Sequence, residues 1–150
     1  KIDCIVSDHS PYTTEDKEKG LDDIRLAAPG INGLELGLPL MFDHGVRTGQ
    51  ISLVQLAEWM ATHPAKLFGL YPRKGSIQIG SDADLVFVEL DHEWVVDPAE
   101  LETKNKWSPF AGWSIKSKVV STYIRGKPVF QKGEFPQGPG FGMALFPGEI

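Results

Sequence analysis

The 150-residue chain carries 15 Lys and Arg against 20 Asp and Glu, a formal net charge of −5 that excludes a general nucleic-acid binder, which needs a basic face. No run approaches the roughly 18 apolar residues of a membrane span, so no membrane partner is expected. Cys4 is the single cysteine, which excludes an internal disulfide and favours a reducing cytoplasm.

The first predicted element is a strand over residues 2–7, an apolar run with β-branched residues that suits a buried parallel strand. Asp8 and His9 follow at its end, and Pro11 prevents regular continuation. A carboxylate at the tip of such a strand lies where α/β barrels hold their active sites. Alternatively, Asp8 caps the next segment and His9 is an ordinary loop histidine.

A parallel strand so close to Lys1 has no neighbour earlier in the chain to pair with. We therefore expect the 150 residues to be the C-terminal piece of a longer polypeptide.

Two loop segments follow the strand. Residues 12–26 are rich in Asp, Glu, Lys and Thr and predict a solvated excursion, with a helical turn over residues 14–19. Residues 27–33 form a Gly, Pro and Asn turn. Its glycines allow close approach to a ligand, and a tight turn before a helix explains them equally well.

Helical periodicity covers residues 34–44, with Gly45 as the expected C-cap. Gly37 and Pro39 weaken the first turns of this helix. The apolar stripe consists of Leu34, Leu38, Met41 and Phe42.

Ser52 and Gln55 have the spacing of a capping box and predict the start of the next helix. Residues 62–64 are expected to end it, and a short helix that begins at the proline is closed by Gly69. His63 is expected at a helix end and not as a metal ligand.

The sequence changes at Lys74 from helical periodicity to short β-rich runs. Residues 125–127 predict a hairpin turn, and residues 135–150 predict irregular structure rich in Pro and Gly. We therefore predict an α/β unit over residues 1–73 and a mostly β unit over residues 74–150. The expected strands are residues 75–80, 83–90, 94–96, 118–124 and 128–130.

Six blocks in this order resemble the cyclic amidohydrolases of the amidohydrolase superfamily, and allantoinases and dihydroorotases in particular. The first contains Ser7-Asp8-His9-Ser10-Pro11, and the resemblance covers nearly the whole chain. The blocks are residues 5–11, 30–35, 62–70, 75–86, 106–112 and 124–129.

The resemblance implies a fold of class α/β plus β, in which a metal-dependent (β/α)8 barrel is followed by part of a β-sandwich. Residues 2–7 would be the eighth barrel strand. Asp8 would be a metal ligand and the catalytic proton carrier, at a zinc site with two metal ions. The other ligands, a His-x-His pair, a carboxylated lysine and two more histidines, are absent from this sequence. This chain alone is therefore expected to be inactive without the N-terminal part of the barrel.

The chemistry that the resemblance implies is hydrolysis of a ring amide in a small-molecule cyclic amide or ureide. A metal-activated water attacks the amide carbon, and its proton must reach the leaving nitrogen. A carboxylate within reach of both can carry that proton. The full-length protein is expected to be a homo-oligomer.

Tyr12 bears on the substrate, because dihydroorotases often hold the substrate carboxylate with a histidine at this place. A neutral phenol is a poorer anchor for a carboxylate than an imidazolium. With Pro29, Gly30 and Asn32 as further substrate-binding residues, the pattern favours an allantoinase, which converts allantoin to allantoate. A dihydroorotase of pyrimidine biosynthesis, a hydantoinase, a metal-less scaffold homologue and an independent binding module are the alternatives.

Overall fold

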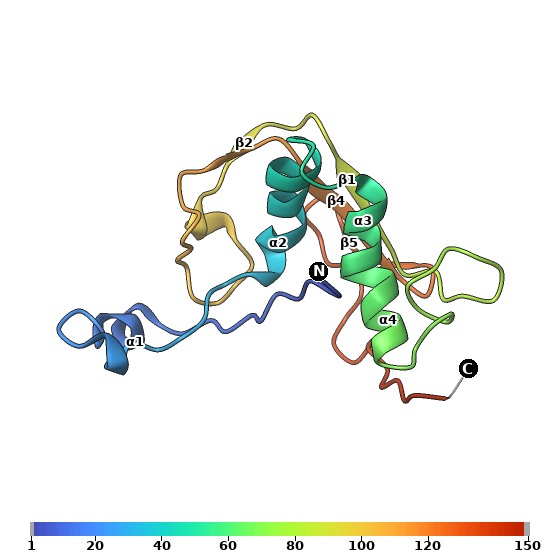
Figure 1. Ribbon diagram of the computed structural model, residues 1–150, viewed down its shortest axis with the longest axis horizontal. Coiled ribbons are helices and arrows are strands. Elements are labelled where there is room, and N and C mark those ends of the chain that lie inside the picture. The colour runs from blue at the N-terminus through green and yellow to red at the C-terminus, as the bar shows by residue number, and fades with distance from the viewer. Residues whose placement is uncertain (1, 149–150) are drawn as a thin grey trace.

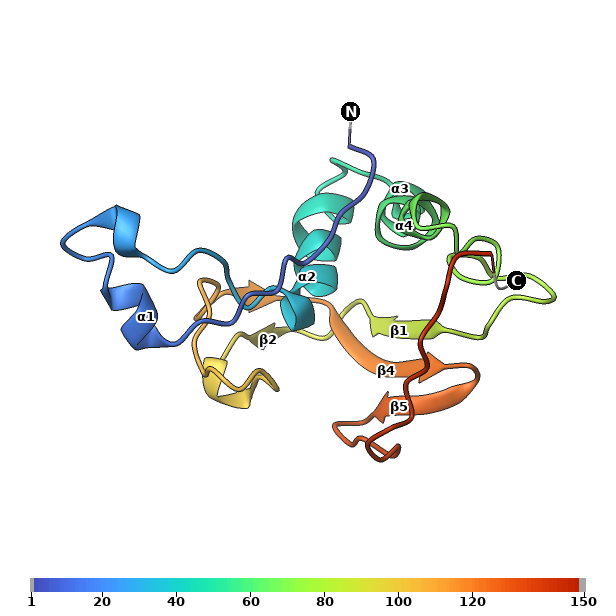
Figure 2. The ribbon, with the colours of Figure 1, turned by 90° about the horizontal axis from the view of Figure 1, so that it is seen from below.

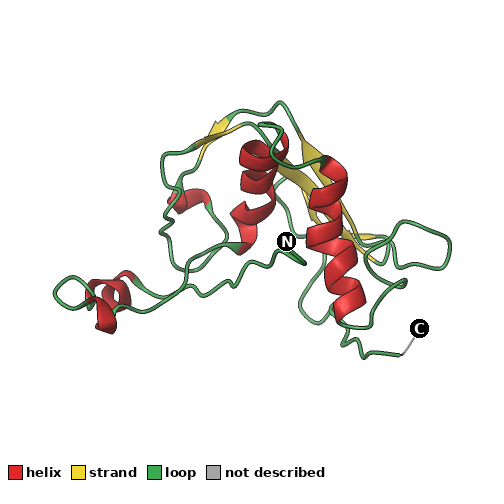
Figure 3. Cartoon of the chain, in the orientation of Figure 1, coloured by secondary structure: helices red, strands yellow, loops and turns green. Residues whose placement is uncertain are grey.

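The computed structural model describes residues 2–148 (Figure 1). The α-helices precede the strands along the chain, and Figure 3 distinguishes helices from strands by colour. The helices are α1 (Thr14–Glu18), α2 (Leu34–Met41), α3 (Leu53–Ala57) and α4 (His63–Leu67). The strands are β1 (Leu85–Glu89), β2 (Trp94–Val95), β3 (Ser114–Ile115), β4 (Lys118–Ile124) and β5 (Lys127–Gln131). None of the helices in this part of the chain has the length and apolar character that crossing a membrane requires.

The strands form two antiparallel sheets, one of three strands in the order β1-β4-β5 and one of β2 with β3. Leu85 lies opposite Tyr123 in the first sheet, and Trp94 lies opposite Ile115 in the second. Arg125 and Gly126, both with positive φ, turn the chain between β4 and β5, which confirms the predicted hairpin. The short strand β3 was not predicted. The predicted unit boundary between residues 73 and 74 stays a prediction.

The hydrophobic core lies between α2 and the two-stranded sheet. Leu36 of α2 is buried together with Val96, Leu101 and Ile115. Burying one such side chain stabilises a fold by about 1.5–3 kcal/mol. The packing of α2 against β2 and β3 therefore joins the helical half of the chain to the strand half.

The predicted capping box is present at the start of α3. The Ser52 hydroxyl accepts a hydrogen bond from the Gln55 N–H, and the Gln55 side chain accepts one from the Ser52 N–H. The predicted break at residues 62–64 is wrong, because α3 continues through a π-helical turn (Glu58–Thr62) into α4. His63 therefore lies inside a continuous helix, which Gly69 closes with a φ of 68° as predicted.

The π-helical turn explains how the helix passes Pro64. The His63 N–H bonds to the Glu58 carbonyl, five residues back, and Pro64 has no N–H to donate. The Trp59 carbonyl is therefore left free by the helix, and it accepts the Ile5 N–H at 2.9 Å. The irregular turn thus holds the N-terminal segment against the helix.

Gly45 is not the C-cap of the helix that begins at Leu34. The helix continues past Gly45 in a second π-helical turn (Phe42–Val46), and Gly49 follows with a φ of 74°. A Cβ at Gly45 would lie 2.9 Å from Ile51 Cδ1, so Gly45 packs closely against Ile51 and does not end the helix.

The predicted strand over residues 2–7 is not formed within residues 2–148. The segment is extended and largely exposed, and its vicinity contains an isolated parallel bridge between His9 and Ile31. A buried parallel strand requires hydrogen-bonded neighbours on its edges, and the described segments do not supply them. In the described part of residues 1–73, the predicted α/β unit therefore contains helices but no strand.

The predicted strand over residues 75–80 is also wrong, since this segment forms bends and turns. The Ser76 and Ser81 hydroxyls both donate to the Pro72 carbonyl, at 2.8 and 2.7 Å, and close the segment into a loop. Ile77 and Ile79 are fully exposed on it. Residues 135–148 are irregular as predicted, and residues 149–150 of the predicted tail lie outside the described residues.

We expect Ser52→Ala to destabilise the full-length protein by about 1 kcal/mol, because it removes the acceptor for the Gln55 N–H. Thermal or urea unfolding measures the loss. Val54→Ala on the same helix turn is the control, since Val54 is 66% exposed and its truncation should change the stability by less than about 0.5 kcal/mol. Equal destabilisation by both variants would contradict the role of the capping box.

Candidate active site

The loop that follows the N-terminal segment and the turn over residues 27–33 lie side by side. The Ser10 N–H donates to the Ile31 carbonyl at 3.0 Å. Gly30 has a φ of 98°, and a Cβ there would lie 2.4 Å from Ser10 Cβ. A Cβ at Gly33 would lie 2.9 Å from the Ser7 carbonyl oxygen. Both glycines are therefore required by the close approach of these two segments.

A third segment, residues 105–107, joins the first two through four hydrogen bonds. Asn32 is 3% exposed, and its amide nitrogen donates to the carbonyls of Asn105 at 3.0 Å and Trp107 at 2.6 Å. The Asn105 amide nitrogen donates to the Pro11 carbonyl, and Trp107 Nε1 donates to the Tyr12 carbonyl at 2.7 Å. Segments far apart in the sequence thus meet around Asn32.

Asp8 lies at the edge of this junction, between Ser7 and His9. Its φ is 41°, in the left-handed region that Asp tolerates better than most residues. Its carboxylate is exposed and makes no hydrogen bond or ion pair to any residue in the range 2–148. Asp8 does not cap α1, because Thr13 accepts from the Asp16 N–H there. The Asp8 carboxylate is therefore available to a ligand.

His9 caps α2 instead. Its Nδ1 accepts the Leu34 N–H at 3.2 Å, at the first residue of the helix. This hydrogen bond engages Nδ1 as an acceptor, so Nδ1 is not available to a metal ion. The interpretation of His9 as an engaged loop histidine is correct.

The other predicted site residues differ in what they offer a ligand. Tyr12 is 40% exposed and borders a small hollow of about 190 Å³ with Ser10 and Pro11. Pro29 is exposed, whereas the Gly30 carbonyl is already engaged by Lys17. The Asn32 side chain is used in the junction, with its Oδ1 buried and unpaired, but its backbone N–H makes no hydrogen bond to another described residue.

Lys17 is the residue at this site that sequence reasoning missed. Its ammonium donates to the carbonyls of Ala28, at 2.7 Å, and Gly30. It also lies 5.2 Å from the ring centre of Trp107 and 5.9 Å from that of Tyr12. In the sequence Lys17 is one charge in a polar stretch, and no local signal separates it from its solvated neighbours.

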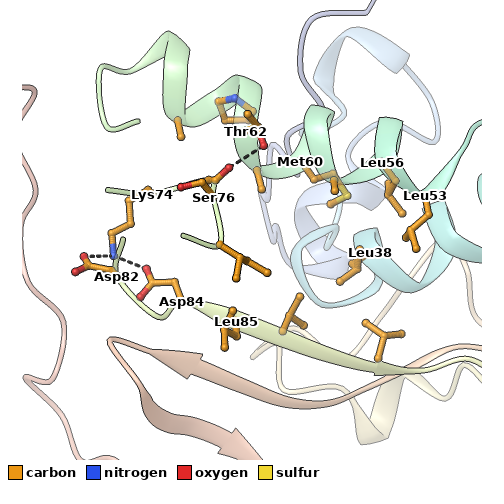
Figure 4. A pocket seen from close by; sticks show the side chains of 18 of the residues that line it. Leu38, Leu53, Leu56, Met60, Thr62, Lys74, Ser76, Asp82, Asp84 and Leu85 are labelled. Carbon is orange, nitrogen blue, oxygen red and sulfur yellow. Dashed lines mark hydrogen bonds and ion pairs between the residues drawn. The ribbon is translucent and has the colours of Figure 1, made fainter. Parts of the chain in front are cut away.

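A larger groove lies elsewhere, between the α3–α4 helix and β1 (Figure 4). It has a volume of about 890 Å³ and is lined mainly by aliphatic side chains such as Leu56 and Leu85. Lys74 pairs with Asp82 at 2.9 Å and with Asp84 at its margin, and the hydrogen bond from Lys74 lowers the pKa of Asp82 below its usual range. None of its lining residues belongs to the Asp8 junction.

A zinc ion is compatible with Asp8 but needs more ligands than the described residues supply. A carboxylate oxygen is a suitable zinc ligand, and catalytic zinc sites use three protein ligands and a water. No group of three His, Cys, Asp or Glu side chains comes together within residues 2–148. The neighbouring His9 uses Nδ1 to cap α2, so Asp8 fits as one ligand of a larger set.

Known proteins resemble this chain over most of its length. It is 45% identical over 142 residues to the L-hydantoinase of Paenarthrobacter aurescens, which aligns 95% of this chain with 31% of that protein. The dihydroorotase of Bacillus caldolyticus is 41% identical over 133 residues, 88% of this chain and 30% of that protein. The allantoinase of Streptomyces avermitilis is 40% identical over 139 residues, 93% of this chain and 30% of that protein.

The chain thus spans about 30% of the length of the curated relatives it matches. Its structure superposes on 32% of a solved L-hydantoinase (dihydropyrimidinase) from Arthrobacter aurescens with a TM-score of 0.89 at 45% identity, covering 95% of this chain. The barrel part of the predicted fold class is confirmed, since the structural neighbours are hydantoinases of the amidohydrolase TIM-barrel fold, whereas the β-sandwich assignment stays a prediction. Residues 8–129 match the Amidohydrolase family, which confirms the resemblance seen in the sequence: the chain belongs to the amidohydrolase family.

Proposed function

We propose that the full-length protein hydrolyses a ring amide of a cyclic ureide, with Asp8 as a metal ligand and as the proton carrier. The observation that supports this role is the exposed, unengaged carboxylate of Asp8 beside the turn that contains Gly30 and Asn32. The named relatives, a hydantoinase, a dihydroorotase and an allantoinase, support the reaction class.

The reaction adds water across one C–N bond of the ring. Zinc, when bound, supplies an activated water and polarises the ring carbonyl. The Asp8 carboxylate accepts the proton of the attacking water and returns it to the ring nitrogen as the C–N bond breaks, so the ring opens to a carboxyl group and a ureido NH2 and Asp8 is regenerated. The free backbone N–H of Asn32 is a donor for a ring carbonyl or for an oxygen on which negative charge develops.

The substrate we propose is a five-membered hydantoin ring without a ring carboxylate, and allantoin in particular. Allantoin is a hydantoin that carries a ureido group, so hydantoinases and allantoinases open the same kind of ring. Tyr12 offers a hydroxyl, which can hydrogen-bond a ureido group but cannot neutralise a carboxylate. Two cations on the excursion could be considered as partners for a substrate carboxylate, but both are already engaged. Arg25 pairs with Asp23 at 2.8 Å, and Lys17 donates to backbone carbonyls.

Dihydroorotate hydrolysis is the second candidate, because a dihydroorotase is 41% identical to the chain. This substrate carries a carboxylate that a desolvated site must neutralise.

The homo-oligomeric state and the cytoplasmic location stay predictions.

Asp8→Asn in the metal-loaded full-length protein should lower kcat by about 10²–10⁴-fold, because the amide keeps the shape but cannot accept the proton. Steady-state hydrolysis and zinc content, measured on the same sample, separate loss of proton transfer from loss of metal. Asp22→Asn is the control, since Asp22 is exposed on the excursion. Near-normal turnover of Asp8→Asn would remove Asp8 from the mechanism.

Gly30→Ala should raise KM or abolish activity, because its Cβ would overlap Ser10 Cβ at 2.4 Å and push the turn away from the Asp8 loop. Gly133→Ala is a matched control, since Gly133 has a φ of 83° but an added Cβ meets no atom within 4 Å. It therefore tests backbone strain without the clash. Equal effects of the two variants on KM would show that the contact with Ser10 does not matter.

A side-by-side assay of allantoin, hydantoin and dihydroorotate tests the substrate. An unsatisfied buried charge costs about 1–3 kcal/mol, so kcat/KM for allantoin should exceed that for dihydroorotate by at least about tenfold. Equal or better hydrolysis of dihydroorotate would overturn the allantoinase assignment and support the dihydroorotase. No turnover of any ring by the metal-loaded protein would support a scaffold homologue.

A further inference from the structure

Lys17 connects the excursion to the turn that carries the candidate substrate-binding residues. It belongs to α1, a single helical turn capped by Thr13, whose hydroxyl accepts the Asp16 N–H at 3.2 Å. Figures 1 and 2 both place α1 on an arm that extends away from the sheets. Lys17 reaches back from this arm and is half-buried.

The contacts of the Lys17 ammonium all converge on the site. Ala28 and Gly30 lie on either side of Pro29, and both of their carbonyl oxygens accept a hydrogen bond from Lys17. The rings of Trp107 and Tyr12 lie within cation–π range of the same ammonium. A charged donor makes stronger hydrogen bonds than a neutral one, so this one group restrains both sides of the turn.

We propose that Lys17 is a positioning residue for ring recognition, an inference that rests on the proposed function of this site. Its ammonium fixes the turn over residues 28–32 against Tyr12 and Trp107, and so aims the free backbone N–H of Asn32 at the ring. Lys17 itself does not contact the ring, because at least two of its three N–H donors are engaged by carbonyls.

The alternative role for Lys17 is direct pairing with a substrate carboxylate, and the two roles predict different kinetics. A positioning residue affects the KM of every ring, with or without a carboxylate. A direct anion contact affects dihydroorotate and leaves hydantoin and allantoin unchanged. A substitution that distinguishes the two roles must therefore remove the charge of Lys17 and keep its aliphatic stem.

The experiment compares Lys17→Met, Lys17→Arg and Lys19→Met in the full-length metal-loaded protein. Lys19 is the matched control, since its side chain is 63% exposed and pairs with Asp16 at 2.6 Å without touching the turn. Lys17→Met should raise KM for all hydrolysed rings by about ten- to a hundredfold with a smaller change in kcat, as expected for a misplaced binding group. Lys17→Arg should restore most of the loss, because a guanidinium can donate to two carbonyls and stack on the rings.

Amide hydrogen exchange over residues 27–34 provides a readout that does not depend on activity. Exchange in this segment should be faster in Lys17→Met than in the wild type and unchanged in Lys19→Met. Three outcomes would overturn the proposal. They are unchanged exchange and KM in Lys17→Met, an effect of Lys17→Met on dihydroorotate alone, and an equal effect of Lys19→Met. If the wild type hydrolyses none of the rings, the proposed function fails and the exchange result alone decides whether Lys17 holds the turn.

Discussion

The buried amide of Asn32 is the interaction on which the candidate site depends. One side chain donates to two carbonyls of the 105–107 segment, and that segment in turn holds the carbonyls of Pro11 and Tyr12. These bonds link the Asp8 loop, the turn before α2 and the strand half of the chain. Because Asn32 is 3% exposed, leaving its amide nitrogen without these two carbonyl partners would cost free energy, which restricts the geometry of the junction.

The hydrophobic core lies next to this junction along the chain. Leu36 of α2, a few residues beyond Asn32, packs against Leu101, a few residues before Asn105, and also against Val96 and Ile115. Glu35 accepts the Glu102 N–H at 2.9 Å at the same contact, and burial raises the pKa of Glu35 above its usual value. The apolar contacts thus bring the two segments together, and the polar contacts set their register.

Features that depend on local chemistry could be predicted from the sequence. The capping box at Ser52, the closing Gly69 and the Arg125-Gly126 turn involve residues only a few positions apart. The failures have non-local causes. The Trp59 carbonyl that the π-helical turn frees is bonded by Ile5 from the other end of this half of the chain. Residues 2–7 lack strand neighbours, and the bonds of Lys17 and Asn32 span 11 to 75 positions. The identity of the candidate site came from the order of its motifs, and its geometry required the folded chain.

The two ends of the excursion over residues 12–26 are held by hydrogen bonds. Trp107 holds the carbonyl of its first residue, Tyr12, and Lys17 holds the carbonyl of Ala28, two residues beyond its last. It is therefore an Ω-shaped loop whose neck is fixed while its tip, around Leu21 and Ile24, stays exposed. Lengthening a flexible loop with a closed neck costs only about 0.6 kcal/mol for each doubling of its length. Insertions at this tip can thus reshape the rim of the site in evolution without displacing the Asp8 carboxylate.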